Sequence, residues 1–124
     1  MRNAFLPPTA LKMMKSLPEN SFESISLRTV ASGGETLGKE LIEWGKRVFN
    51  LTINEFYGQT ECNMIVSSCA ALEPATPGLM GRPVPGHQVD IVDVLSGEPV
   101  PDGAEGAIAV RSPNPVMFLS LIHI

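Results

Sequence analysis

The sequence has few of the residues on which several classes of protein depend. Only two cysteines, Cys62 and Cys69, and two histidines occur in 124 residues. Two thiols are too few for a disulfide framework, and no further ligand stands at zinc-site spacing from them. We therefore expect both thiols to be ordinary buried or half-buried side chains.

Positive charge and long apolar runs are scarce as well. The chain has nine Lys and Arg residues but thirteen Asp and Glu residues, so its formal net charge is −4. The basic residues do not cluster, which argues against nucleic acid as a partner. No segment approaches the ~20 apolar residues of a membrane helix, and the first residues have no apolar stretch of the signal-peptide kind. The sequence thus predicts a cytoplasmic protein with no membrane span and no nucleic-acid partner, and says nothing of its oligomeric state.

The composition that remains, 44% hydrophobic and 18% charged residues, is that of a globular chain. Its best-patterned segment is 37–49, which we predict to be a helix with Thr36 as its N-cap. A shorter amphipathic helix is predicted over 10–17, with Thr9 as its N-cap. The buried stripe of the longer helix is expected to be Leu37, Leu41, Trp44 and Val48.

Strand-like segments flank the longer helix. Residues 25–31 and 51–56 are predicted strands; the glycine turn Gly33-Gly34-Glu35 follows the first, and the strand pattern of the second stops at Gly58. Strand, turn, helix and strand make a βαβ unit, whose strands are parallel and joined by a right-handed crossover. Both strands then end at the same edge of the sheet, so the glycine turn and the residues after Gly58 are predicted neighbours.

The second half of the chain is predicted to be antiparallel β. Residues 89–94 alternate as a strand, and 106–111 form the returning strand. Gly- and Pro-rich turn signals lie between them. We therefore divide the chain into a βαβ part, residues 1–72, and a β-rich part, residues 73–119.

The residues after the second predicted strand have the chemistry of a nucleotide site. The hydroxyl of Thr60 can donate to a phosphate oxygen, and the carboxylate of Glu61 can hold Mg²⁺, a hard cation that shares phosphate oxygens. The ring of Tyr57 can lie against a base. The turn at 33–35 can offer backbone N–H groups to an anion, but it lacks the G-K-[ST] ending of a P-loop. By itself, a plain strand-to-helix turn is the commoner explanation of that segment.

Several separated segments resemble the adenylate-forming enzymes, the superfamily of acyl-CoA synthetases, luciferases and peptide-synthetase adenylation domains. Tyr57-Gly58-Gln59-Thr60-Glu61 resembles their Y-G-x-T-E motif. With the preceding Glu-Phe, the segment is most similar to the acetyl- and medium-chain acyl-CoA synthetase branch. The other similar segments, in the family's order, are 31–35, 78–86 and 103–111.

The resemblance implies roles for individual residues. Thr60 and Glu61 are implied to be catalytic, Thr60 through contact with the α-phosphate and Glu61 as the Mg²⁺ ligand. The residues implied in ATP binding are Gly33, Gly34, Glu35, Thr36, Glu55, Phe56, Tyr57, Gly58, Gln59 and Thr60.

The resemblance also implies a fold and a reaction. Residues 1–119 would be an incomplete piece of the large N-terminal α/β domain of an AMP-dependent synthetase/ligase, and residues 120–124 a non-native or truncated end. The parent enzyme would use ATP and Mg²⁺ to adenylate a small-molecule carboxylic acid and would then transfer the acyl group to CoA. No segment of this sequence resembles the family's phosphate loop, its ribose-binding aspartate or its C-terminal lysine domain, so we expect the chain alone to be inactive.

Other functions are compatible with the same residues. A non-catalytic ATP- or AMP-binding module would need only the binding half of the site. An adenylation domain that loads a carrier protein shares these motifs with enzymes that use CoA. A purely structural βαβ unit would bind no nucleotide at all.

Overall fold

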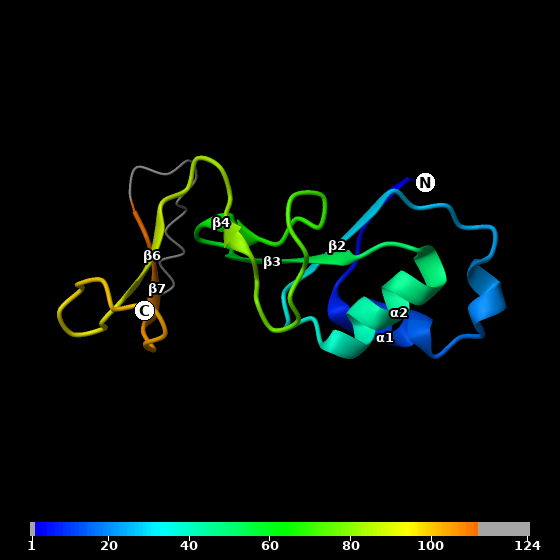
Figure 1. Ribbon diagram of the computed structural model, residues 1–124, viewed down its shortest axis with the longest axis horizontal. Coiled ribbons are helices and arrows are strands. Elements are labelled where there is room, and N and C mark those ends of the chain that lie inside the picture. The colour runs from blue at the N-terminus through cyan, green and yellow to red at the C-terminus, as the bar shows by residue number, and fades with distance from the viewer. Residues whose placement is uncertain (1, 112–124) are drawn as a thin grey trace, which may run out of the picture.

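The computed structural model describes residues 2–111, which form a five-stranded mixed sheet, two α-helices and a separate two-stranded sheet (Figure 1). Predictions for residues 112–124, which include the end of the β-rich part and the non-native end at 120–124, lie outside the described residues. The elements are β1 (Asn3–Phe5), α1 (Pro8–Lys15), the 3-10 helix η1 (Glu19–Phe22), β2 (Thr29–Gly33), α2 (Lys39–Phe49), β3 (Ile53–Gln59), β4 (Asn63–Ser67), β5 (Arg82–Pro83), β6 (Val89–Val92) and β7 (Ala107–Val110).

The strands of the larger sheet follow the order β1-β2-β3-β4-β5. β1 pairs with β2 and β2 with β3 in parallel, whereas β3–β4 and β4–β5 are antiparallel. The predicted α/β class is therefore confirmed, with β2, α2 and β3 as the βαβ unit. The chain reverses after β3, which makes the sheet mixed.

Both helices cover one face of this sheet, and among residues 2–111 no helix packs on the other face (Figure 1). Val30 and Ile53 point from the central strands toward the helices, where both are fully buried with Leu41 and Trp44. Because side chains alternate along a strand, the residues next to Val30 and Ile53 on their own strands point to the opposite, open face of the sheet. That face carries Phe5, Ala31, Gly33, Asn54 and Phe56.

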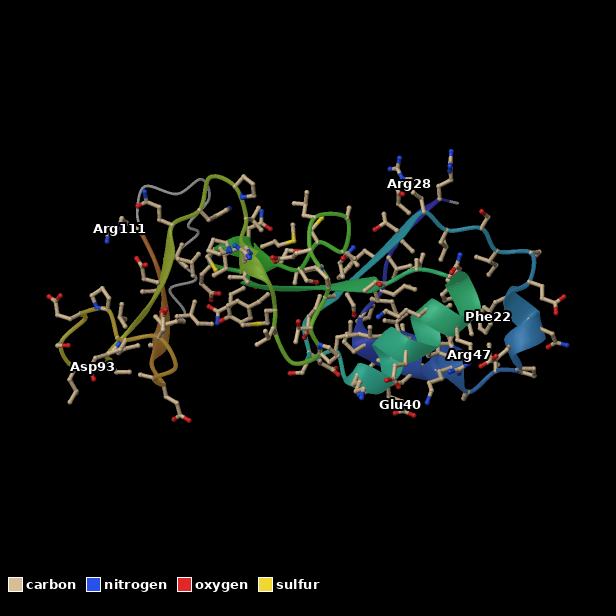
Figure 2. All side chains as sticks on the ribbon, in the orientation of Figure 1. Phe22, Arg28, Glu40, Arg47, Asp93 and Arg111 are labelled. Atoms are coloured by element: carbon tan, nitrogen blue, oxygen red, sulfur yellow. The ribbon has the colours of Figure 1, made fainter. Side chains whose placement is uncertain are left out.

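An aromatic cluster closes the core between α2 and η1. Trp44 packs edge-on against Phe22 and Phe49, with ring centroids 5.8 and 5.2 Å away. Such pairs contribute roughly 0.5–1.5 kcal/mol beyond their buried area. Arg47 on α2, labelled in Figure 2, bonds Glu19 of η1 with an Nη2–Oε1 distance of 2.7 Å, which ties the 3-10 helix to the same surface.

The helix starts differ from the sequence prediction. The first helix begins at Pro8 with Pro7 as N-cap, so Thr9 lies inside the first turn and caps nothing. Proline suits that place, because the first helical N–H groups need no partner within the helix. The longer helix begins at Lys39 with Gly38 as N-cap and no side-chain cap, so the prediction for Thr36 was also wrong. Its C-cap is Asn50, in the left-handed conformation that ends many helices.

The strand boundaries differ too. β2 begins at Thr29 and not at residue 25, because its pairing with β1 starts where Asn3 lies opposite Thr29. β3 does not stop before Gly58 but continues through Gln59, since β4 folds back on it and pairs Gly58 with Met64. The register shifts between Tyr57 and Gly58, which marks a β-bulge at this point.

The smaller sheet, β6 with β7, confirms the predicted antiparallel second half, although the first strand ends at Val92. It lies at the end of the molecule remote from the helices (Figure 1). Val89 and Val110 pack from it against a second buried cluster of Cys62, Ile65 and Val66. None of the helices in residues 2–111 has the length and apolarity needed to cross a membrane.

Candidate functional site

The predicted neighbours do meet at the sheet edge. Gly33, the last residue of β2, lies opposite Phe56 of β3. A Cβ on Gly33 would stand 2.6 Å from Cε2 of Phe56, so the Phe56 ring lies directly over this glycine. The ring also packs against Phe5, with centroids 5.2 Å apart. The absence of a side chain at residue 33 therefore shapes the open face of the sheet.

A cavity of about 420 Å³ lies between the β2–α2 turn and the end of β3. Most of the residues predicted to bind ATP line it together, because both strands of the βαβ unit end at this edge of the sheet. Its lining consists of Gly34, Glu35, Thr36, Glu55, Phe56, Tyr57, Gly58, Gly78 and Met80. We call it the turn cavity.

A second hollow of about 810 Å³ lies on the open face of the sheet. It holds three of the predicted site residues that the turn cavity lacks, namely Gly33, Gln59 and Thr60. Apolar groups from Phe5, Ala31 and Met64 line the rest together with small polar side chains. We call it the face cavity.

The two cavities share part of their lining. Gly34, Phe56 and Gly58 border both of them. The turn cavity and the face cavity are therefore adjacent at the end of β3. Such an arrangement suits a reaction that joins two bound groups.

Thr60 and Glu61 occupy the turn between β3 and β4. Thr60 is exposed and lines the face cavity, and Glu61 is half-buried. Within residues 2–111 no ion pair engages Glu61, and no three His, Cys, Asp or Glu side chains form a metal cluster. One carboxylate fits Mg²⁺ only in the manner of nucleotide sites, where phosphate oxygens and water complete the shell.

Two other predicted site residues have protein partners. The carboxylate of Glu55, only 6% exposed, accepts the N–H of Leu37 at 2.8 Å. The Tyr57 hydroxyl accepts a hydrogen bond from Nε2 of Gln59 at 3.0 Å. The Tyr57 ring also packs against the second buried cluster, so its place at the cavity border is fixed by tertiary contacts.

Arg82, in the segment that resembles a family motif, is engaged elsewhere. Its Nη2 and Nε lie 2.7 and 2.8 Å from Oε2 of Glu73. This carboxylate raises the pKa of Arg82, first through the hydrogen bonds and then through its charge. Arg82 therefore ties the loop at Glu73 to β5, and it lines neither the turn cavity nor the hollow on the open face of the sheet.

Sequence reasoning missed several residues that line the cavities. Gly78 and Met80 belong to a motif that the sequence did reveal, but nothing local placed them beside the glycine turn. Phe5 belongs to β1, which was not predicted. From β4 and the residues after it come Met64, Ser67, Ser68 and Cys69.

Comparison with known proteins identifies the family to which the chain belongs. A family model described as AMP-binding enzyme matches residues 3–118. The chain belongs to the AMP-binding enzyme family. It is 38% identical over 115 residues to 4-hydroxybutyrate–CoA ligase 1 of Metallosphaera sedula, a match that covers 91% of the chain. Other curated relatives are acyl- and acetyl-coenzyme A synthetases.

Solved structures of AMP-binding enzymes agree with the fold. The acyl-CoA synthetase of Brucella canis superposes with a TM-score of 0.77 at 32% identity, over 86% of this chain and 20% of that one. The anthranilate CoA ligase AuaEII, solved in complex with anthranoyl-AMP, gives 0.79 at 28% identity, over 92% and 22%. The chain spans about a fifth of the length of the curated relatives it matches. The predicted family and the α/β fold are thus confirmed.

Proposed function

We propose that this chain forms the ATP-binding part of an AMP-forming acyl-CoA synthetase. The observation that carries the proposal is the shared lining of the turn cavity and the face cavity at Gly34, Phe56 and Gly58. Adenylation joins a carboxylate to the α-phosphate of ATP, so the two substrates must meet at one point. In this proposal adenosine occupies the turn cavity, and the carboxylic acid enters from the face cavity.

The residues at the strand end have distinct tasks in this proposal. Tyr57 and the backbone at 34–36 orient the adenosine, which reduces the entropy cost of reaction. The Thr60 hydroxyl donates to the α-phosphate, where negative charge increases in the transition state. Glu61 holds Mg²⁺, which when bound neutralises phosphate charge. The single carboxylate of Glu61 and the exposed hydroxyl of Thr60 beside it are compatible with these roles.

The names of the relatives support a proposal for the complete reaction of the parent enzyme. Those relatives are CoA ligases and CoA synthetases, which favours CoA over a carrier protein as acyl acceptor. In the second step the CoA thiol attacks the acyl-adenylate and AMP leaves. Because no segment of the 124 residues resembles the family's phosphate loop or lysine domain, we expect this chain alone to bind ATP without producing a thioester.

Titration of the chain with a fluorescent ATP analogue tests the proposal. Binding is expected with Mg²⁺ present, and Thr60→Ala should weaken it about tenfold, because a charge-assisted hydrogen bond to phosphate is lost. Glu61→Gln should remove the part of the affinity that depends on Mg²⁺ and leave the rest unchanged.

The matched controls are Thr9→Ala and Glu98→Gln, which remove the same groups from exposed sites on α1 and in the β6–β7 connection. Neither is expected to alter ATP binding. Absence of nucleotide binding by the folded wild-type chain would contradict the proposed function, as would equal losses in the control variants. Thioester formation from acid, ATP and CoA by the chain alone would contradict only its expected inactivity.

A further inference from the structure

A third cavity, of about 570 Å³, lies beside β5 and adjoins the face cavity. The two hollows share the side chains of Met64, Ser67 and Cys69 as a common border. We call this third hollow the β5 cavity. It has no lining residue in common with the turn cavity, so it lies outside the proposed nucleotide site. Beyond the common border its lining consists of Leu72, Glu73, Arg82, Pro83, Val84 and Pro85.

The charges around these two cavities leave no partner for a charged ligand chain. Among residues 2–111, no charged side chain lines the face cavity. The β5 cavity has two, Glu73 and Arg82, and they are bonded to each other with an Nη2–Oε2 distance of 2.7 Å. The guanidinium is thus engaged by its own neighbour. Because removing a charge from water is costly without a partner, both cavities suit an uncharged chain.

Backbone contacts fix one wall of the β5 cavity. The amide of Val84 donates to the carbonyl of Ile65 at 2.9 Å, which ties the residues after β5 to β4. Gly81 approaches β4 so closely that a Cβ there would stand 2.2 Å from the carbonyl oxygen of Ser67. This wall is therefore in place without a ligand, as in most small-molecule sites.

The opposite wall leaves apolar surface exposed to water. The amide of Leu72 donates to the carbonyl of Cys69 at 2.9 Å and closes a turn, on which the Leu72 side chain is 87% exposed. Met64, at the common border, is 39% exposed. An apolar chain lying between them would remove this surface from water, which is favourable in proportion to its area. The unbranched side chain of Met64 can adapt to such a chain.

We propose that the β5 cavity receives the distal end of the carboxylic acid substrate, which is a monocarboxylic acid with an uncharged, apolar chain. The carboxylate lies at the strand end in the face cavity, and the chain passes Met64 and Cys69 to reach Leu72 and Val84. The inference rests on the proposed function for the place of the carboxylate. It adds a second compartment for the chain and thereby names the class of acid.

Titration of the chain with three acids, followed by methyl NMR, measures affinity and position together. Octanoate should bind at least about tenfold more tightly than butyrate, because each buried methylene is worth about fourfold. It should also shift the methyl signals of Leu72 and Val84. The eight-carbon dicarboxylate suberate should bind no more tightly than butyrate, because its second carboxylate finds no free cation in the β5 cavity.

Leu72→Glu places a charge at the β5 cavity, at a position so exposed that the fold does not depend on it. The variant should lose the preference for octanoate over butyrate. Val84→Glu, on the opposite wall, should do the same. The matched control is Leu95→Glu, at a 96% exposed position in the β6–β7 connection, which should keep the preference of the wild-type chain.

The thiol of Cys69 provides a second readout, because it is half-buried at the common border of the two cavities. Octanoate should slow its alkylation by iodoacetamide, as measured by mass spectrometry. Butyrate should slow it less, because the shorter chain ends before the β5 cavity. The buried thiol of Cys62 serves as the internal reference.

Failure of the folded chain to bind octanoate, or equal affinities for octanoate and butyrate, would overturn the inference. An unchanged preference in folded Leu72→Glu and Val84→Glu variants would overturn it too, as would an equal loss in Leu95→Glu. Suberate binding as tight as that of octanoate would contradict the assigned class of acid.

The proposed function fails separately from this inference. A chain that prefers octanoate but does not bind the fluorescent ATP analogue retains the β5 cavity as an acid site and loses the nucleotide site. A chain that binds the analogue and shows no preference among the acids retains the nucleotide site and overturns the inference.

Discussion

At the scale of single residues, two glycines determine the shape of the site. Gly33 leaves room for the Phe56 ring, and Gly58 lets β4 approach so closely that a Cβ there would lie 1.9 Å from the carbonyl oxygen of Asn63. Neither requirement is visible from the neighbouring sequence. Both arise because another segment passes at contact distance.

Gly33→Ala should therefore destabilise the chain by about 1–3 kcal/mol, the usual cost of inserting a methyl group into a packed contact. The clash with Phe56 should also displace its ring and alter both cavities. The free energy of unfolding from urea titration measures the first effect. Gly38→Ala is the control, since nothing lies within 4 Å of its Cβ and its φ of −66° suits alanine, so that only the poorer N-capping by alanine should contribute there. A cost in the control equal to that of Gly33→Ala would contradict the argument.

At the scale of elements, the two helices are joined by charge as well as by packing. Lys15 in the last turn of α1 bonds Glu40 in the first turn of α2, and both lie at the surface (Figure 2 labels Glu40). This hydrogen bond, with the charge of Lys15, lowers the pKa of Glu40 from its ordinary 4.5. A carboxyl with a lowered pKa stabilises the fold above its unfolded pKa, and that stabilisation disappears as the pH falls through the folded pKa.

Glu40→Gln should accordingly lower the free energy of unfolding slightly at neutral pH, and this effect should disappear as the pH falls through the lowered pKa of Glu40, because the protonated carboxyl no longer attracts Lys15. Added salt should shrink the difference at neutral pH, because exposed pairs are screened. Urea titrations at several pH values measure it. The control is Glu105→Gln, an exposed carboxyl outside these helices; a difference that persists at low pH would contradict the role of the ion pair.

At the scale of the whole molecule, the helices of residues 2–111 cover only one side of the five-stranded sheet. α1 and α2 pack on one face, while Phe5 on the other face is 59% exposed. β1 is also the edge strand of the five-stranded sheet. Exposed edges and apolar faces are sites where a second chain can pair.

The chain should therefore self-associate as its concentration rises, and Phe5→Glu should reduce this association by placing charge on the open face. Sedimentation velocity over a range of concentrations measures the effect. Met13→Glu is the matched control, since Met13 is 73% exposed on α1, away from the open face. A wild-type chain that stays monomeric, or an equal effect of both substitutions, would contradict the prediction.

Three features could be predicted from the sequence: the βαβ unit, the antiparallel second half and the meeting of the glycine turn with the end of β3. These follow from apolar periodicity and from the geometry of parallel strands, which act over short stretches of chain. The sequence also indicated most of the residues that line the turn cavity, because two strand ends of one unit share a sheet edge.

Tertiary contacts set the remaining features, which are the helix starts, the extension of β3 and the full lining of the cavities. Thr36 failed as an N-cap while the next amide, that of Leu37, bonds Glu55 of the following strand. Gly78 and Met80 line the turn cavity, and Phe5 lines the face cavity. These residues lie there because segments that are distant in sequence pack beside the strand ends. Local patterns specify which residues can form an element, but contacts between residues far apart in sequence decide where it ends and what it faces.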